Sequence, residues 1–142
     1  VGIPHREVNK RHFRTKTLKR LKLESMIAGN IESHENGKLA IAAVSMEMME
    51  ALSATEGDLD DISAFVGQIE GILTGVTLRE LRPGVWKLSL RTVPEDLNAS
   101  EVCALMGGGG HAAAAGATIE GELSTVKHTV LEAVRTIRSR PH

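Results

Sequence analysis

Apolar residues recur at helical spacing early in the chain and then give way to a strand pattern. A helix can begin with Thr15 or Thr17 as its capping residue and end between Gly29 and Asn36. Asn36-Gly37 predicts a turn, and the continuous apolar run 39–44 predicts a buried strand. We expect the apolar residues of the helix on roughly one face, and they are Leu18, Leu21, Ile27 and Ile31.

Two helices are predicted after this strand. Ser45 can cap a helix that extends through Ala54, and another begins near Gly57. Three carboxylates at the start of the second helix favour interaction with the helix dipole over a metal site, because no histidine or further aspartate lies nearby in sequence. These carboxylates belong to Asp58, Asp60 and Asp61.

Pro83-Gly84 separates two β-rich runs, residues 72–82 and 85–93, and predicts a hairpin. In the second run, apolar Trp86, Leu88 and Leu90 alternate with Lys87, Ser89 and Arg91. The apolar residues should face the core. Arg91 and Ser89 therefore project from the polar side of the sheet, where Arg91 offers a planar donor fork to an anion or simply improves solubility.

The remaining pattern completes one domain. Asn98 or Ser100 can cap a short helix through Met106, residues 114–119 read as a closing strand, and the last helix starts at Ser124. The sum is an α+β (α/β) domain with a mixed β-sheet of about four to five strands and flanking helices, packed mainly on one side. We interpret residues 1–14 as an interdomain linker or the end of a preceding segment, and residues 15–142 as the domain.

Composition limits the partners and the location of the protein. The net charge of -1 gives no global field for nucleic acid or membrane, although residues 1–22 hold eight basic side chains against Glu7 alone. Cys103 is the only cysteine, which excludes an intrachain disulfide and a cysteine-based zinc site and favours the cytoplasm. No apolar run or signal-peptide layout indicates a membrane, and the missing initiator Met indicates a fragment.

Four consecutive glycines precede a histidine at Gly107, Gly108, Gly109, Gly110 and His111. Glycine costs backbone entropy in a packed element, so we expect a loop. Its N–H groups can form an anion nest, and His111 can donate to a phosphate oxygen. A flexible turn with a surface histidine is the alternative. The run is neither a Walker loop nor a dinucleotide-binding fingerprint.

This loop, followed by Ala114, Ala115 and Gly116, resembles the GGGH-x-x-AAG signature of the DHHA1 domain, the C-terminal half of the DHH phosphoesterases. Lys87 to Arg91 resembles the family's strand ending in Ser-Leu-Arg, and Val8 to Arg11 resembles the segment joining the two halves. The likeness is greatest to the group that degrades short oligoribonucleotides and removes phosphate from 3'-phosphoadenosine 5'-phosphate.

The resemblance implies that the parent protein is a hydrolase with two manganese ions in an absent N-terminal DHH domain, its partner here. This chain would bind no metal, contribute no catalytic residue and be inactive alone. Its substrate, a short oligonucleotide or nucleotide, would meet Arg91 and residues Gly107 to His111, with Ser89, Ala115 and Gly116 in secondary roles. Ala112 and Ala113 are smaller than the polar pair expected in the motif.

Two other functions stay open. One is the accessory domain of a RecJ-like single-strand exonuclease or of a cyclic dinucleotide phosphodiesterase. The absence of tyrosine, with only two phenylalanines and one tryptophan, argues against binding of long strands. The other is a non-catalytic nucleotide-binding or oligomerisation module, and a homodimer is compatible with either.

Overall fold

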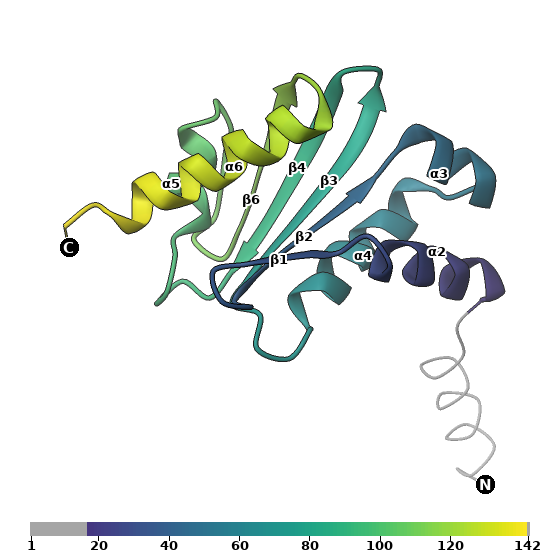
Figure 1. The fold of residues 1–142 in the computed structure, drawn as a ribbon, viewed down its shortest axis with the longest axis horizontal. Coiled ribbons are helices and arrows are strands. Elements are labelled where there is room, and N and C mark those ends of the chain that lie inside the picture. Colours follow the sequence, from purple (N-terminus) through teal and green to yellow (C-terminus); the bar gives the residue numbers. More distant parts are fainter. Residues whose placement is uncertain (1–16, 142) are drawn as a thin grey trace, which may run out of the picture.

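The computed structural model describes residues 17–141, and these form helices around one six-stranded sheet (Figure 1). The predicted linker 1–14 and most of the basic residues of segment 1–22 lie outside the described residues. Within the described part, no helix is long and apolar enough to cross a membrane.

The elements follow the predicted order, with five helices and six strands in the described part of the chain. The helices are α2 (Leu18–Ala28), α3 (Met46–Leu52), α4 (Glu56–Gly67), α5 (Ala99–Ala104) and α6 (Leu123–Arg138). The strands are β1 (Glu32–His34), β2 (Leu39–Val44), β3 (Thr74–Arg82), β4 (Val85–Thr92), β5 (Gly109–Gly110) and β6 (Ala114–Glu120).

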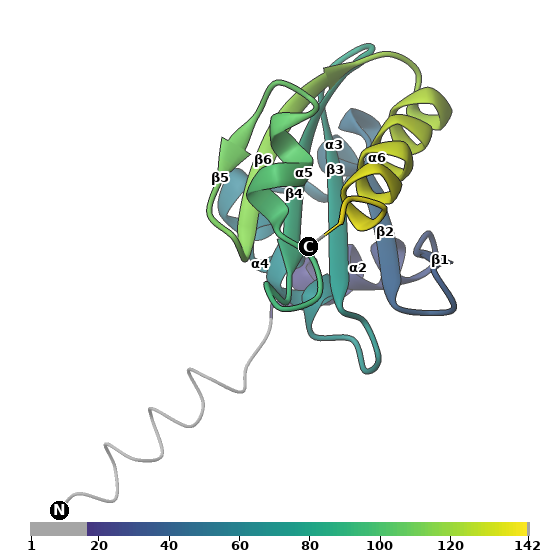
Figure 2. The same cartoon turned by 90° about the vertical axis from the view of Figure 1, so that its left-hand side faces the viewer.

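The sheet is mixed, with the strand order β1-β2-β3-β4-β6-β5. Strands β2 and β3 pair in parallel, and the other neighbours pair antiparallel. The α+β class is confirmed, and the strand count is slightly higher than expected. The additional strands are the two edges, β1 with three residues and β5 with two, which are too short to show an alternating apolar pattern (Figure 2).

Helices cover both faces of the sheet, so the expectation that they pack mainly on one side is wrong. Helices α5 and α6 lie on one side, and α2, α3 and α4 on the other (Figure 1). Strand β2 explains the second layer because all six of its residues are buried. Its Leu39 and Ile41 join the core under α6, while its Ala40 and Ala42 join a second core under α2 and α4.

Helix α2 begins where expected, and it buries Ile27 of the predicted apolar face but not Leu18 or Leu21. The Thr17 side chain accepts a hydrogen bond from the Arg20 backbone N–H, as a capping residue should. Leu18 and Leu21 are 66% and 49% exposed, whereas Leu23 and Ile27 are fully buried. The spacing of four residues from 23 to 27 therefore sets the face that packs on β2.

The predicted turns and caps are largely confirmed. Asn36 and Gly37 adopt positive φ angles of 57° and 82° in the β1–β2 turn, and Gly84 adopts 77° between β3 and β4. Helix α4 begins one residue before Gly57, because Thr55 and Asp58 form a reciprocal capping box. The Asp58 carboxylate thus stabilises a helix start.

Candidate ligand-binding site

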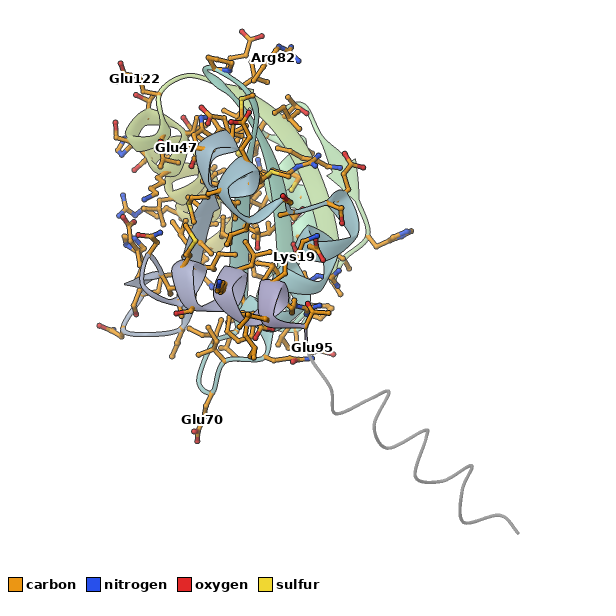
Figure 3. The ribbon with its side chains drawn as sticks, turned by 90° about the vertical axis from the view of Figure 1, so that its right-hand side faces the viewer. Lys19, Glu47, Glu70, Arg82, Glu95 and Glu122 are labelled. Atoms are coloured by element: carbon orange, nitrogen blue, oxygen red, sulfur yellow. The ribbon has the colours of Figure 1, made fainter. Side chains whose placement is uncertain are left out.

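Strand β4 presents the two faces that its alternation predicts. Trp86, Leu88 and Leu90 are buried in the core under α6, while Lys87 and Arg91 are exposed on the opposite face. Arg91 lies near the end of β4 and pairs with Gly75 of β3 and Ala114 of β6. Glu70 and Glu95 mark this end of the molecule in Figure 3, and Arg82 marks the other.

The glycine run was expected to form a loop, but part of it forms a strand of the sheet, and this pairing explains why glycine is needed there. Gly109 and Gly110 form edge strand β5, which pairs with Ala115 and Gly116 of β6. A Cβ atom on Gly108 would lie 2.1 Å from the Gly116 carbonyl oxygen, and one on Gly110 would lie 2.6 Å from Ala115 Cα. Close approach of two backbones therefore excludes larger residues at 108 and 110.

Backbone N–H groups at both ends of this run are bonded inside the chain and so are not available to the expected anion nest. Gly107 N–H donates to Ala104 at 3.2 Å, and Gly108 N–H donates to Cys103 at 2.9 Å, which closes the end of α5. His111 N–H donates to the Ala114 carbonyl at 2.8 Å. With these donors satisfied inside the chain, side chains must provide most of the contacts to an anion.

His111 and Arg91 are brought to the same end of the sheet. Ala114 N–H donates back to the His111 carbonyl at 3.3 Å, so His111 and Ala114 pair across a two-residue connection. Ala114 also pairs with Arg91. Because directly paired residues share a face, His111, Ala114 and Arg91 form one row, with the outer two roughly 10 Å apart, which is two strand spacings.

A pocket of about 350 Å³ opens beside this row. Arg91, Ala113 and Ala114 line it together with Gly67 and Gln68 from the end of α4. Such a volume lies at the lower end of the range for small-molecule sites. No local pattern predicts that α4 borders the site, because Gly67 approaches Arg91 only through the packing of α4 on the sheet.

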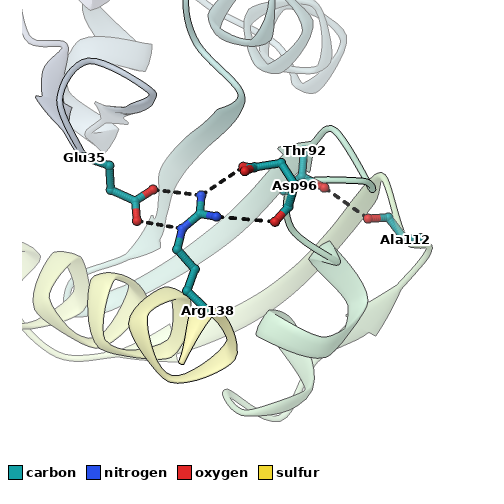
Figure 4. Close-up of polar contacts among 5 residues, drawn as sticks. All are labelled: Glu35, Thr92, Asp96, Ala112 and Arg138. Carbon is teal, nitrogen blue, oxygen red and sulfur yellow. Dashed lines mark hydrogen bonds and ion pairs between the residues drawn. The ribbon is translucent and has the colours of Figure 1, made fainter. Parts of the chain in front are cut away.

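Thr92 anchors the connection between β5 and β6, a role that the sequence did not indicate. Its N–H donates to the Ala113 carbonyl at 2.9 Å, and its Oγ1 donates to the Ala112 carbonyl at 3.1 Å (Figure 4). The Ala99 N–H reaches the same Ala112 carbonyl at 2.8 Å. These bonds fix the residues that directly follow Arg91 and His111, the two predicted contacts.

Metal ligands and reactive groups can be sought only among the side chains that the structure describes, which leave out those at 59–61 and 64. Among the side chains described, no three from His, Cys, Asp or Glu come together in a way that could hold a metal ion. Burial raises the pKa of the Cys103 thiol to about 11, so it is protonated at neutral pH and poorly suited to act as a nucleophile. The arrangement suits binding and orientation of an anionic ligand.

Comparison with known families agrees with this geometry. Residues 36–138 match the DHHA1 domain family. The chain belongs to this family. The match contains both Arg91 and the Gly107 to His111 run, so the DHHA1 signature lies on strands β4, β5 and β6 and on the turn between them.

One curated relative shows how much of a longer protein this chain corresponds to. The bifunctional oligoribonuclease and PAP phosphatase NrnA of Thermus thermophilus is 33% identical over 115 residues, which cover 80% of this chain and 33% of NrnA. The chain therefore spans about a third of the length of this relative.

Among solved structures, an exopolyphosphatase-related protein of Bacteroides fragilis has a TM-score of 0.79 at 20% identity. The superposed region covers 94% of this chain and 39% of the Bacteroides chain. A pGpG-specific phosphodiesterase, PggH of Vibrio cholerae, has a TM-score of 0.56 at 12% identity. Here the superposed region covers 87% of this chain and 40% of the PggH chain. At these identities the two structures support the fold alone.

Proposed function

We propose that this chain is the substrate-binding domain of a manganese-dependent DHH phosphoesterase that hydrolyses short oligoribonucleotides or nucleoside bisphosphates. Arg91 and His111 would bind the terminal phosphate, and the rest of the substrate would extend toward a DHH domain of the parent protein. The chain alone would bind without hydrolysing. The name of the similar Thermus protein supports this choice of substrates.

The observation that carries the proposal is the row of Arg91, Ala114 and His111 beside the pocket. A guanidinium and an imidazole that flank a small residue can donate to one anionic group from two sides. Ala114 leaves room between them. The pocket of about 350 Å³ suits a nucleotide-sized group, which is consistent with short substrates.

The metal belongs to the part of the proposal that lies outside this chain. The residues described in 17–141 do not fit a manganese site, since no group of three candidate ligands is present among them. We therefore assign no hydrolytic step to this chain. Its role in catalysis would be to hold the phosphate so that the scissile bond is oriented before reaction.

Binding measurements on the chain test this role. Isothermal titration with a 5'-phosphorylated diribonucleotide and with 3'-phosphoadenosine 5'-phosphate should show binding that weakens roughly tenfold in Arg91→Ala, because a charge-assisted hydrogen bond is lost. His111→Ala should weaken binding by a similar factor. Lys87→Ala is the matched control, since Lys87 is also exposed on the same face of β4.

Equal affinities of the Arg91→Ala, His111→Ala and unaltered proteins would refute the proposed contacts. Affinity should also stay flat as a single strand is lengthened beyond a few nucleotides, because the chain lacks an aromatic platform. A steady rise with length would favour the exonuclease alternative. If pGpG binds most tightly, the accessory domain of a cyclic dinucleotide phosphodiesterase is favoured instead.

A further inference from the structure

Arg138, the last residue of α6, donates four hydrogen bonds to two acidic residues. Its Nε and Nη2 donate to the two carboxylate oxygens of Glu35 at 2.7 and 2.9 Å. Nη2 also donates to Asp96 Oδ2 at 3.0 Å, and Nη1 donates to the Asp96 carbonyl at 3.4 Å (Figure 4). Arg138 thereby ties α6 to the β1–β2 turn and to the segment after β4.

Asp96 lies in the middle of the segment that holds the site. Residues 93–98 connect β4 to α5, and Thr92 and Ala99 at the two ends of this connection donate the hydrogen bonds that fix Ala112 and Ala113. Between these ends, the backbone of Val93 donates to Leu73 at 3.2 Å, and Pro94 and Glu95 are exposed. Leu97 of this connection is buried in the core against α6, and Arg138 holds the neighbouring Asp96, so these two contacts are the long-range anchors of the connection to α6.

The positive charge of Arg138 adds to the effect of its hydrogen bonds, because it lies between two carboxylates. Glu35 and Asp96 accept from the same Arg138 nitrogen, so their carboxylates are close neighbours. Without the guanidinium between them, the two negative charges would repel each other and push Asp96 outward. The hydrogen bonds that Arg138 donates to Glu35 and to Asp96 outweigh burial and raise the pKa of Arg138, so its positive charge is permanent at neutral pH.

We infer that Arg138 is a positioning residue for the proposed site: by holding Asp96 it fixes residues 92–99, which in turn hold Ala112 and Ala113 beside His111. This inference rests on the proposed function, because it concerns the same site. Arg138 itself need not touch the ligand. Its two partners are 42 and 103 positions away, and both contacts depend on the closed fold.

Hydrogen exchange tests the positioning without any ligand. In Arg138→Gln, the Thr92 and Ala99 amides should exchange roughly fivefold faster than in the unaltered chain, because the segment between them loses its charged anchor to α6. Asp96→Ala should show a smaller increase, since it removes the tie without leaving two facing carboxylates. Arg138→Lys keeps the charge but loses the planar guanidinium. Its exchange rates should lie between those of Arg138→Gln and those of the unaltered chain.

Two variants separate positioning from general stability. Arg135→Gln removes a second arginine of the last turn of α6, whose 2.7 Å bond to Glu132 stays within the helix, and should change neither amide. Glu35→Gln weakens the bond to α6 but leaves Asp96 paired. It should lower the melting temperature without accelerating exchange at Thr92 and Ala99 beyond the rest of the sheet.

Affinity for 3'-phosphoadenosine 5'-phosphate, measured at a temperature where every variant is folded by circular dichroism, completes the test. Arg138→Gln should bind roughly fivefold more weakly, and Glu35→Gln and Arg135→Gln should bind like the unaltered chain. Unchanged exchange in Arg138→Gln, or equal exchange and affinity losses in Glu35→Gln, would overturn the positioning role. If the unaltered chain binds no nucleotide, the proposed function fails, while the exchange result still decides whether Arg138 holds the segment.

Discussion

Strands β2 and β4 belong to the same sheet, but their faces are used differently. All residues of β2 are buried, because one face lies in the core under α6 and the other in the core under α2 and α4. Strand β4 buries Leu88 and Leu90 on one face and exposes Lys87 and Arg91 on the other. A strand covered on both faces has no side chain free to contact a ligand along its length, whereas a strand with exposed side chains on one face does.

The largest expected effect is a core substitution in β2. Ile41→Ala should lower the free energy of unfolding by about 4 kcal/mol, because the fully buried side chain is replaced by a cavity. Lys87→Ala, on the open face of β4, should change it by less than about 0.5 kcal/mol. Urea unfolding measures both, and a similar loss in the two variants would break the contrast between the strands.

A smaller effect is expected where β5 meets β6, at the border of the open face. Gly108→Ala should cost about 3 kcal/mol in urea unfolding, because its Cβ would meet the backbone of Gly116 at 2.1 Å. Gly109→Ala is the matched control. A Cβ there meets nothing within 4 Å, so we expect a change below about 0.5 kcal/mol. Equal losses would mean that the run is needed for flexibility and not for close approach.

The smallest effect concerns α4, which covers the second face of β2. Asp58→Asn should cost about 0.5 kcal/mol at neutral pH, since it weakens an exposed capping box. The backbone hydrogen bond from Thr55 lowers the pKa of Asp58 below its ordinary 3.8. The charged carboxylate therefore stabilises the fold above pH 3.8, and this stabilisation is lost as the pH falls through the lower pKa of the folded state.

Unfolding curves from pH 7 down to pH 2 measure this dependence. The difference between Asp58→Asn and the unaltered chain should shrink toward zero at the acid end. A difference that stays constant over this range would show that the charge of Asp58 does not matter to the helix.

Local patterns in the sequence predicted much of the fold. The alternation in β4, the turn at Pro83-Gly84 and the caps at Thr17 and Asn98 depend on residues a few positions apart, and the structure confirms them. The buried face of α2 was predicted only in part: Ile27 is buried as expected, but Leu18 and Leu21 are exposed and Leu23 is buried instead. Leu18, Leu21 and Leu23 all fit a helical period with Ile27 or with one another, and only the sheet beneath the helix selects among them.

The sequence by itself determined that Arg91 lies on the polar face of its strand, because side chains alternate along any strand whatever it pairs with. It also identified the glycine run as special, but not why: the reason is the approach of Gly108 and Gly110 to β6. The tertiary structure alone decided that Arg91 and His111 lie in one row, that the end of α4 borders Arg91, and that Arg138 reaches Asp96. Those contacts depend on how distant segments pack, and no local period encodes them.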